Sequence, residues 1–199
     1  MAEEPKVCPY LDIPFQHLDD TMLRAMARGG TGEGIRRLVA RFREAIPDLT
    51  IRTTFIVGFP GEAEAQFATL LHGLEELQFD RVGAFVYSPE EGTAAGSLGG
   101  RVPRRVALAR RRRLMAVAGR VAHARGRGLV GTRQRILVDG PSLESPLLMQ
   151  GRTAAHAYEV DGVVYLSGGP VRPGTFVQGR ITAARGHDLV ADVLGPGGM

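Results

Sequence analysis

The feature that most constrains this chain is the stretch Ile51–Glu62, a run of β-branched and apolar residues that ends in Gly-Phe-Pro-Gly-Glu. The run predicts a buried strand, and the glycines and proline predict a tight turn, because Gly accepts positive φ and Pro fixes φ. We expect a helix to begin at Glu62, where the macrodipole favours an acid. This combination is typical of a cradle for a nucleotide-like ligand, although an ordinary β-to-α turn has the same pattern.

Side-chain alternation along this strand separates a polar face from an apolar one. One side carries Arg52, Thr54, Ile56 and Gly58, and the other carries Ile51, Thr53, Phe55 and Val57. Polar side chains on a buried strand predict a face that lines a polar cavity. The alternative is an Arg that points to the edge of an ordinary turn.

Two further strands are predicted, at Val7–Phe15 and at Arg81–Tyr87. Helical patterns lie between and after them. The first expected helix is capped by Asp19 or Asp20 and runs to Arg28, and the second is capped by Thr31 and runs to Ile46. Two more are expected from Glu62 to Leu77 and from Pro103 to Gly126. The order β-α-α-β-α-β has crossovers long enough for parallel strands. Right-handed crossovers place the carboxyl ends of all three strands at one edge, where α/β sheets and barrels keep their active sites.

Charge is strongly segregated along the sequence. Residues 1–100 carry 9 basic and 15 acidic side chains, whereas residues 101–135 carry 12 arginines and no acid. This basic block has three possible counterparts, which are RNA, an acidic protein surface and the acidic first half of the same chain. The arginine run Arg110–Arg113 is interpreted mainly as a solvated helix face.

Composition limits the class of protein. A hydrophobic content of 44% with 23% charged residues is ordinary for a soluble globular protein, and no apolar run approaches the ~20 residues that span a bilayer. The first residues lack the features of a signal peptide. Cys8 is the single cysteine, which excludes an internal disulfide and a cysteine-only metal site and fits the reducing cytoplasm. We expect Cys8 to be a small packing residue at the start of a strand.

From Val130 the pattern changes to short alternating strands separated by Gly/Pro turns. The expected strands are Gln134–Val138, Leu147–Arg152, Gly162–Leu166, Thr175–Ala183 and Leu189–Leu194. Five strands of this length predict a small antiparallel barrel of the OB type. Its few aromatic residues, Tyr158, Tyr165 and Phe176, are a thin platform for stacking single-stranded RNA.

The segments Tyr10–His17, Arg52–Glu62 and Asp80–Thr93 resemble the radical S-adenosylmethionine methylthiotransferases. Glu159–Leu166 and His187–Val190 resemble the TRAM domain of the same family, in the member that modifies an aspartate of ribosomal protein S-twelve. The resemblance implies an α/β fold in which residues 1–127 form the second half of a radical-SAM partial (βα) barrel. Residues 128–195 would form the TRAM β-barrel.

The resemblance also implies a function. The complete enzyme would cleave S-adenosylmethionine and place a methylthio group on the β-carbon of the aspartate, with the TRAM domain docking on ribosomal protein S-twelve or the small ribosomal subunit in the cytoplasm. We assign no catalytic or metal-binding side chain within this chain. The residues expected to bind S-adenosylmethionine are Gln16, His17, Arg52, Thr54, Gly58 and Tyr87. Arg52 is expected to pair with the methionine carboxylate, and Gly58 to admit the nucleoside closely.

The sequence departs from the family at its iron–sulfur clusters. The family needs three cysteines for the cluster that cleaves S-adenosylmethionine and further cysteines for a second cluster, and Cys8 alone holds neither. We therefore expect the chain to be a carboxyl-terminal fragment, inactive when expressed alone. The alternatives are a fragment of a transfer-RNA methylthiotransferase and a stand-alone module that binds RNA or the ribosome. Residues 136–199 carry 4 arginines against 6 acids, which counts against the stand-alone module.

Overall fold

The computed structural model describes residues 1–145 and 147–197, which form two compact units. The first is Leu11–Val121, and the second consists of residues from Ala122 onward with Glu3–Tyr10. The division falls inside a long helix. The domain boundary after residue 127 stays a prediction.

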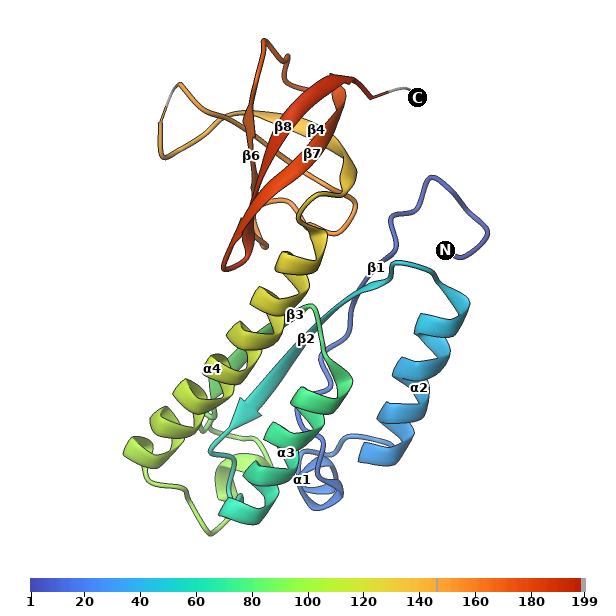
Figure 1. Cartoon of the computed structure of the whole chain (residues 1–199). Coiled ribbons are helices and arrows are strands. Elements are labelled where there is room, and N and C mark those ends of the chain that lie inside the picture. Colours follow the sequence, from blue (N-terminus) through green and yellow to red (C-terminus); the bar gives the residue numbers. More distant parts are fainter. Residues whose placement is uncertain (146, 198–199) are drawn as a thin grey trace. The chain divides into compact units, whose positions relative to one another are not determined.

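The first unit is built on a three-stranded sheet in the order β1 (Tyr10–Asp12), β2 (Thr50–Val57) and β3 (Arg81–Val86) (Figure 1). β2 and β3 pair in parallel from Arg52 opposite Arg81 to Val57 opposite Val86, and the bridge beyond β1 is also parallel. The predicted β-α-α-β-α-β order with parallel strands is confirmed.

The helices begin where the sequence supplies caps. Asp19 accepts hydrogen bonds from the backbone of Thr21 and Met22, and Thr31 accepts one from Gly34, so both predicted N-caps are confirmed. The helices are α1 (Asp20–Ala25), α2 (Gly32–Ala45), α3 (Glu64–Leu77) and α4 (Arg104–Leu129), with a short 3-10 turn η1 (Ala95–Ser97) before α4.

The core lies on one face of the sheet only. On that face the apolar side chains of β2 pack against α2, α3 and α4, and the members include Val39, Phe55, Phe67, Leu74 and Leu114. On the opposite face β2 is half-buried at every second residue, and Phe85 of β3 is 63% exposed. The predicted alternation of β2 between a buried and a more open face is confirmed, and the open face carries the apolar Ile56 and Phe85 beside the polar Arg52 and Thr54.

Several predicted bounds are wrong, each for a local reason. β1 is shorter than Val7–Phe15, because prolines at positions 9 and 14 restrict the backbone on either side. α1 stops before Arg28, because Ala27 takes a positive φ of 53°. Cys8 is exposed and is not a packing residue.

The barrel of the second unit is closed, in the order β4, β5, β6, β8, β7. Its strands are β4 (Arg133–Pro141), β5 (Met149–Arg152), β6 (Val164–Ser167), β7 (Phe176–Arg185) and β8 (Asp188–Pro196). The five predicted strands are confirmed, but the barrel is not wholly antiparallel, because β6 and β8 run in parallel. Between β6 and β8 in the sequence the chain forms β7, which pairs with β8 on the side away from β6. Because β8 runs antiparallel to β7, it has the same direction as β6.

The interior of the barrel is filled by aliphatic side chains, including Ile136, Val164, Ile181 and Ala191. Gly151 and Gly179 lie so close to Ile136 that a Cβ at either position would collide with it. The barrel is therefore a packed core without room for an internal ligand. Among the residues that the structure describes, no helix has the length and apolar character of a membrane span.

Candidate functional site

Three of the predicted site residues lie where the strands end at one edge of the sheet. The Gln16 N–H donates to the Thr54 carbonyl, and the Ile56 N–H donates to the Gln16 carbonyl, both at 2.9 Å. The Tyr87 N–H donates to Val57 just before Gly58. The backbone thus brings the ends of β1, β2 and β3 together, as the parallel topology predicts.

Arg52 and Thr54 lie on the uncovered face of β2. Arg52 forms an ion pair with Asp12 of β1, and its side chain is 29% exposed. The same face of β3 presents Gly83 beside Thr54, since a Cβ on that glycine would lie 3.4 Å from the Thr54 hydroxyl oxygen. A ligand on this face therefore meets a hydroxyl and an Arg–Asp pair.

The Gln16 side chain accepts a hydrogen bond of 2.7 Å from Arg28, and its backbone holds a positive φ of 67°. Left-handed backbone at a non-glycine residue is strained and often marks a functional position. Gln16 therefore lies at this edge of the sheet with its backbone hydrogen-bonded to β2 and its side-chain oxygen hydrogen-bonded to Arg28.

His17 is completely buried. Its Nδ1 accepts the backbone N–H of Asp19 at 3.0 Å, so the ring proton is on Nε2, which lies 3.4 Å from Oε1 of Glu62. Both ring nitrogens are used within the protein. The geometry gives His17 a positioning role at the strand end and leaves neither nitrogen open to a ligand.

Glu62 is the most important residue that sequence reasoning missed. It precedes α3, so the expected place in the first helical turn is wrong, and its buried carboxylate turns back to accept the Gly58 N–H. Arg110 of α4 donates to the Glu62 carboxylate at 2.9 Å and to its carbonyl at 2.7 Å. With His17, these residues form a buried polar network that fixes the turn.

The Arg110–Arg113 run is not a solvated face throughout, which corrects the main interpretation. Arg110 is 6% exposed and lies over the Phe67 ring, and Arg113 forms an ion pair of 2.7 Å with Glu64. The hydrogen bond from Arg113 lowers the pKa of Glu64. Part of the basic block therefore meets the acidic first half of the chain. The missed signal is the spacing of Arg110 between buried Ala107 and Leu114 on one helical stripe.

Gly58 is required by its own turn and by α4. Its φ is +75°, and a Cβ would lie 2.4 Å from the Cβ of Ala107. The close approach that we expected of a nucleoside is made here by a helix of the same chain.

Tyr87 contributes an orphaned polar atom. Within the described part of the chain its hydroxyl is buried and has no hydrogen-bond partner. Its ring packs edge-on against the Phe59 ring, with 4.9 Å between the two ring centroids. Tyr87 and Gly58 line a cavity of about 310 Å³, and Arg101 and Arg104 are also among its lining residues.

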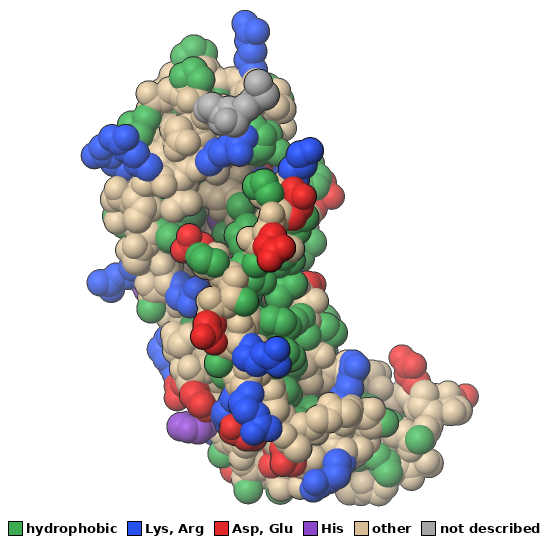
Figure 2. All heavy atoms as spheres, turned by 90° about the vertical axis from the view of Figure 1, so that its right-hand side faces the viewer, with side chains coloured by type: hydrophobic (Ala, Val, Ile, Leu, Met, Phe, Trp, Pro, Cys, Tyr) green, Lys and Arg blue, Asp and Glu red, His purple; other side chains and the backbone are tan. Residues whose placement is uncertain are grey.

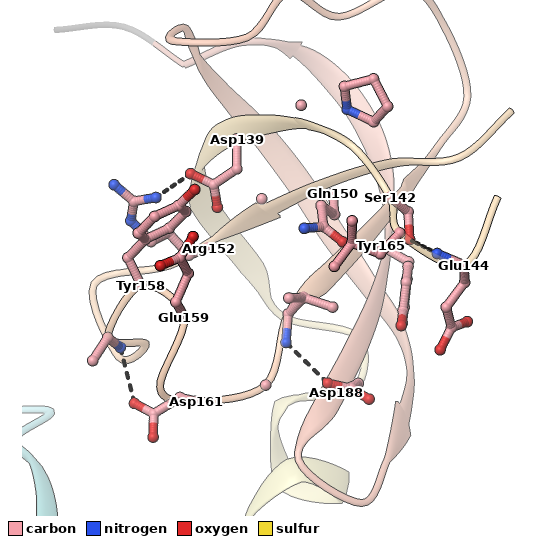
Figure 3. A pocket seen from close by; sticks show the side chains of 17 residues that line it. Asp139, Ser142, Glu144, Gln150, Arg152, Tyr158, Glu159, Asp161, Tyr165 and Asp188 are labelled. Carbon is pink, nitrogen blue, oxygen red and sulfur yellow. Dashed lines mark hydrogen bonds and ion pairs between the residues drawn. The ribbon is translucent and has the colours of Figure 1, made fainter. Parts of the chain in front are cut away.

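A second cavity, of about 520 Å³, lies on the outside of the barrel (Figure 3). Its lining has five acids and a single Arg: Asp139, Glu144, Glu159, Asp161, Asp188 and Arg152. Arg152 is paired with Asp139, and its guanidinium lies 4.7 Å from the centre of the Tyr158 ring. The four remaining carboxylates give this cavity a strong negative charge.

Two protein-family models match the chain, the Radical SAM superfamily at residues 1–74 and the TRAM domain at residues 130–194. Over 98% of its length the chain is 47% identical to "Ribosomal protein uS12 methylthiotransferase RimO" of Geobacter sulfurreducens, and 47% identical to the RimO of Sorangium cellulosum. The chain is therefore similar to these RimO proteins over nearly all of its own length. The resemblance to the radical SAM methylthiotransferases is confirmed.

The chain spans about two fifths of the length of these relatives, 43% of the first and 40% of the second. Among solved structures it is similar to the radical SAM enzyme coproporphyrinogen III oxidase (HemN) of Escherichia coli. The TM-score is 0.50 at 15% identity, over 86% of this chain and 41% of that one. At this identity the likeness concerns the fold, and it agrees with the predicted radical-SAM architecture.

Tyr165, which lines the acidic cavity, should give the cavity a titration signature. Burial and the Glu144 carboxylate raise the pKa of Tyr165 to about 12. Because the folded pKa exceeds the unfolded one, the stabilising contribution is complete below the unfolded pKa of about 10 and is lost as pH rises through about 12. We expect the tyrosinate absorbance to show a late phase that Tyr165→Phe removes and Glu144→Gln moves to lower pH. A late phase that survives Tyr165→Phe would contradict this assignment.

On the face seen in Figure 2, basic and acidic side chains of the described residues are interspersed and do not gather into one basic patch. This agrees with the pairing of α4 arginines with acids of the same chain, such as Arg120 with Glu75 at 3.1 Å. A broad basic surface, the electrostatic requirement of a stand-alone RNA-binding module, is not present on this face.

Proposed function

We propose that the chain forms the S-adenosylmethionine-binding edge and the TRAM domain of a cytoplasmic enzyme that methylthiolates an aspartate of ribosomal protein uS12. The observation that carries this proposal is the identity with RimO over 98% of the chain. The uncovered polar face of β2 supports it, because this face ends at the edge where parallel α/β sheets place their ligands.

The edge residues fit the cofactor by their chemistry. The Tyr87 hydroxyl has no partner among the described residues, and the Thr54 hydroxyl lies on the uncovered face of β2 that leads to this edge. S-adenosylmethionine would supply the radical chemistry and a four-iron four-sulfur cluster the electron for it. The single Cys8 of this chain is not a cluster ligand set, so the clusters would be held by other parts of the enzyme.

A chimeric enzyme tests the activity. The segment of Geobacter sulfurreducens RimO that matches this chain is replaced by the chain, and the reconstituted enzyme is supplied separately with uS12 and with transfer RNA. We expect a mass gain of one methylthio group on the uS12 aspartate and none on the RNA. Modification of the RNA alone would establish the transfer-RNA alternative, which the names of the relatives do not favour.

Binding of S-adenosylmethionine tests the role of the uncovered face. Thr54→Val removes one hydroxyl there and should weaken binding by about threefold to tenfold, the usual worth of one neutral hydrogen bond. Isothermal titration of the full chain measures this. Thr69→Val is the matched control, because Thr69 lies half-buried on α3, away from the sheet edge, and its hydroxyl donates to the Ala65 carbonyl. Equal affinities of the two variants would place the cofactor elsewhere.

We propose that the acidic cavity of the barrel docks a basic segment of uS12. Carboxylates in a concave site attract and orient lysine and arginine side chains, and the tyrosine rings beside them offer cation–π faces. The sparse aromatics and the interspersed surface charges disfavour RNA as the main partner of this domain.

The docking proposal predicts a salt-dependent loss. Glu144→Gln with Glu159→Gln should weaken binding of uS12 several-fold at low ionic strength, and added salt should shrink the difference. Surface plasmon resonance measures both. Glu90→Gln is the control, since Glu90 is exposed and lies outside the cavity. Unchanged affinity of the double variant would refute docking at this cavity.

A further inference from the structure

Four arginines of α4 form a regular array on the side of the helix that faces away from the core. Arg105 and Arg112 are seven residues apart, so they lie on one stripe, about 10.5 Å apart along the helix axis. Arg104 and Arg111 repeat this spacing on the neighbouring stripe. All four are exposed, whereas Leu114 on the opposite side of the helix is completely buried. These four residues are called the arginine array below.

The charge of the arginine array is not balanced by the protein. Within the part of the chain that the structure describes, none of its members forms an ion pair with an acid, and Arg111 donates to a neutral group, the Ala84 carbonyl, at 3.1 Å. The 26 residues of α4 contain no Asp or Glu. The array is thus a group of uncompensated positive charges on one face of the helix.

Two other arginines of α4 show that the protein does compensate charge on a different side of the same helix. Arg113 pairs with Glu64 at 2.7 Å, and Arg120 pairs with Glu75 at 3.1 Å. These two arginines are also exposed and also seven residues apart. Acids of α3 therefore neutralise the side of α4 that faces them and leave the arginine array to a partner outside the chain.

The place of the array in the helix makes its charge unfavourable for the isolated chain. Arg104 and Arg105 lie in the first turn of α4, where the positive end of the helix dipole disfavours cations, and this turn has no acid. A bound polyanion would remove this unfavourable interaction.

The partner has to carry a row of negative charges. Guanidinium groups pair with phosphate through two parallel hydrogen bonds, and a nucleic-acid backbone presents phosphates at regular intervals. The basic segment of uS12 that we place in the acidic cavity of the barrel is excluded as the partner, because like charges repel. The relatives are named for a ribosomal protein, and such a protein is surrounded by RNA once its subunit is assembled.

We propose that the arginine array binds the phosphate backbone of ribosomal RNA and directs the enzyme to uS12 in RNA-containing ribosomal particles. The proposal rests on the proposed function and names the form in which the substrate is bound. Contacts to phosphates carry no sequence information, so this binding depends steeply on salt and little on RNA sequence. The array holds the particle and carries no chemical step.

Binding of the full chain to protein-free RNA of the small ribosomal subunit tests the array, with fluorescence anisotropy as the readout. Arg105→Gln combined with Arg112→Gln should weaken binding about tenfold at low salt. It should also flatten the slope of log affinity against log salt by about 1.5, because each lost phosphate contact removes ~0.7–0.9. Arg104 and Arg111 are kept, because Arg104 lines the cavity beside the sheet edge and Arg111 contacts β3.

Arg113→Gln combined with Arg120→Gln is the matched control. It removes the same two charges at the same spacing from the same helix, but from arginines that are already paired with acids. Circular dichroism checks that each double variant is folded. Equal loss of affinity in the two double variants would show an effect of net charge alone and refute the array, as would failure of the native chain to bind the RNA at low salt.

The chimeric enzyme separates this inference from the proposed function. We expect a lower KM for uS12 within small ribosomal subunits than for free uS12, and Arg105→Gln with Arg112→Gln should abolish this difference without changing kcat on free uS12. If the chimera modifies uS12 and shows no such difference, the array is refuted and the proposed function stands. If it modifies neither form while the chain binds RNA through Arg105 and Arg112, the array stands and the proposed function fails.

Discussion

Glu62→Ala is expected to lower the free energy of unfolding by about 3–5 kcal/mol, the cost of removing one partner from a buried ion pair. The carboxylate is fully buried and accepts hydrogen bonds from Arg110 and from the Gly58 backbone. Without it, a guanidinium and a backbone N–H are left inside the protein unpaired. Urea denaturation followed by circular dichroism measures the change.

Glu75→Ala is the matched control for this experiment. Glu75 also pairs with an arginine of α4, but the two side chains are 54% and 66% exposed, so solvent screens the pair and its loss should cost less than about 1 kcal/mol. Equal losses for Glu62→Ala and Glu75→Ala would show that the buried network does not hold the turn.

Gly58→Ala should destabilise the chain for two separable reasons. The added methyl group would lie 2.4 Å from the Cβ of Ala107, and overpacking costs about 1–3 kcal/mol. The φ of +75° adds about 1–2 kcal/mol for a residue with a Cβ. The midpoint of denaturation measures the sum.

Two further variants separate these costs. Gly92→Ala keeps only the second, because Gly92 has a φ of +77° with no atom near its missing Cβ. Combining Gly58→Ala with Ala107→Gly should recover the part due to the collision. If the double variant is no more stable than Gly58→Ala, the contact with α4 is not what excludes a side chain at this position.

The sequence predicted the strands, the two N-caps and the polar face of β2, because each depends on a local pattern of alternation, capping or glycine placement. It did not predict the role of Glu62, because a carboxylate in a first helical turn and one that folds back on a glycine turn have the same local sequence. It also placed Arg110 in solvent, because a run of four arginines hides the single position that faces the core. Both errors concern pairing across 48 residues, which local pattern does not encode.

The sequence predicted the place of the candidate site in the fold better than it predicted the partners of the individual side chains. Parallel topology was enough to bring Gln16, Gly58 and Tyr87 to one edge. The partners of Arg52 and His17 depend on side-chain packing between elements, and that packing engages both with acids of the same chain. The cofactor-binding roles of the six residues stay predictions that the binding experiments address.

The closure of the TRAM barrel has a consequence for how such proteins evolve. Every strand of the barrel is paired on both sides, so the domain has no free edge, whereas β1 and β3 of the three-stranded sheet are each paired on one side. A unit without free edges can be joined by gene fusion to unrelated catalytic domains and leave nothing at the junction for another chain to pair with. The sheet lacks this freedom. Its two edge strands need neighbouring segments of the protein to cover their unpaired backbone groups. We therefore expect the barrel to be duplicated and reused in other proteins more readily than the sheet.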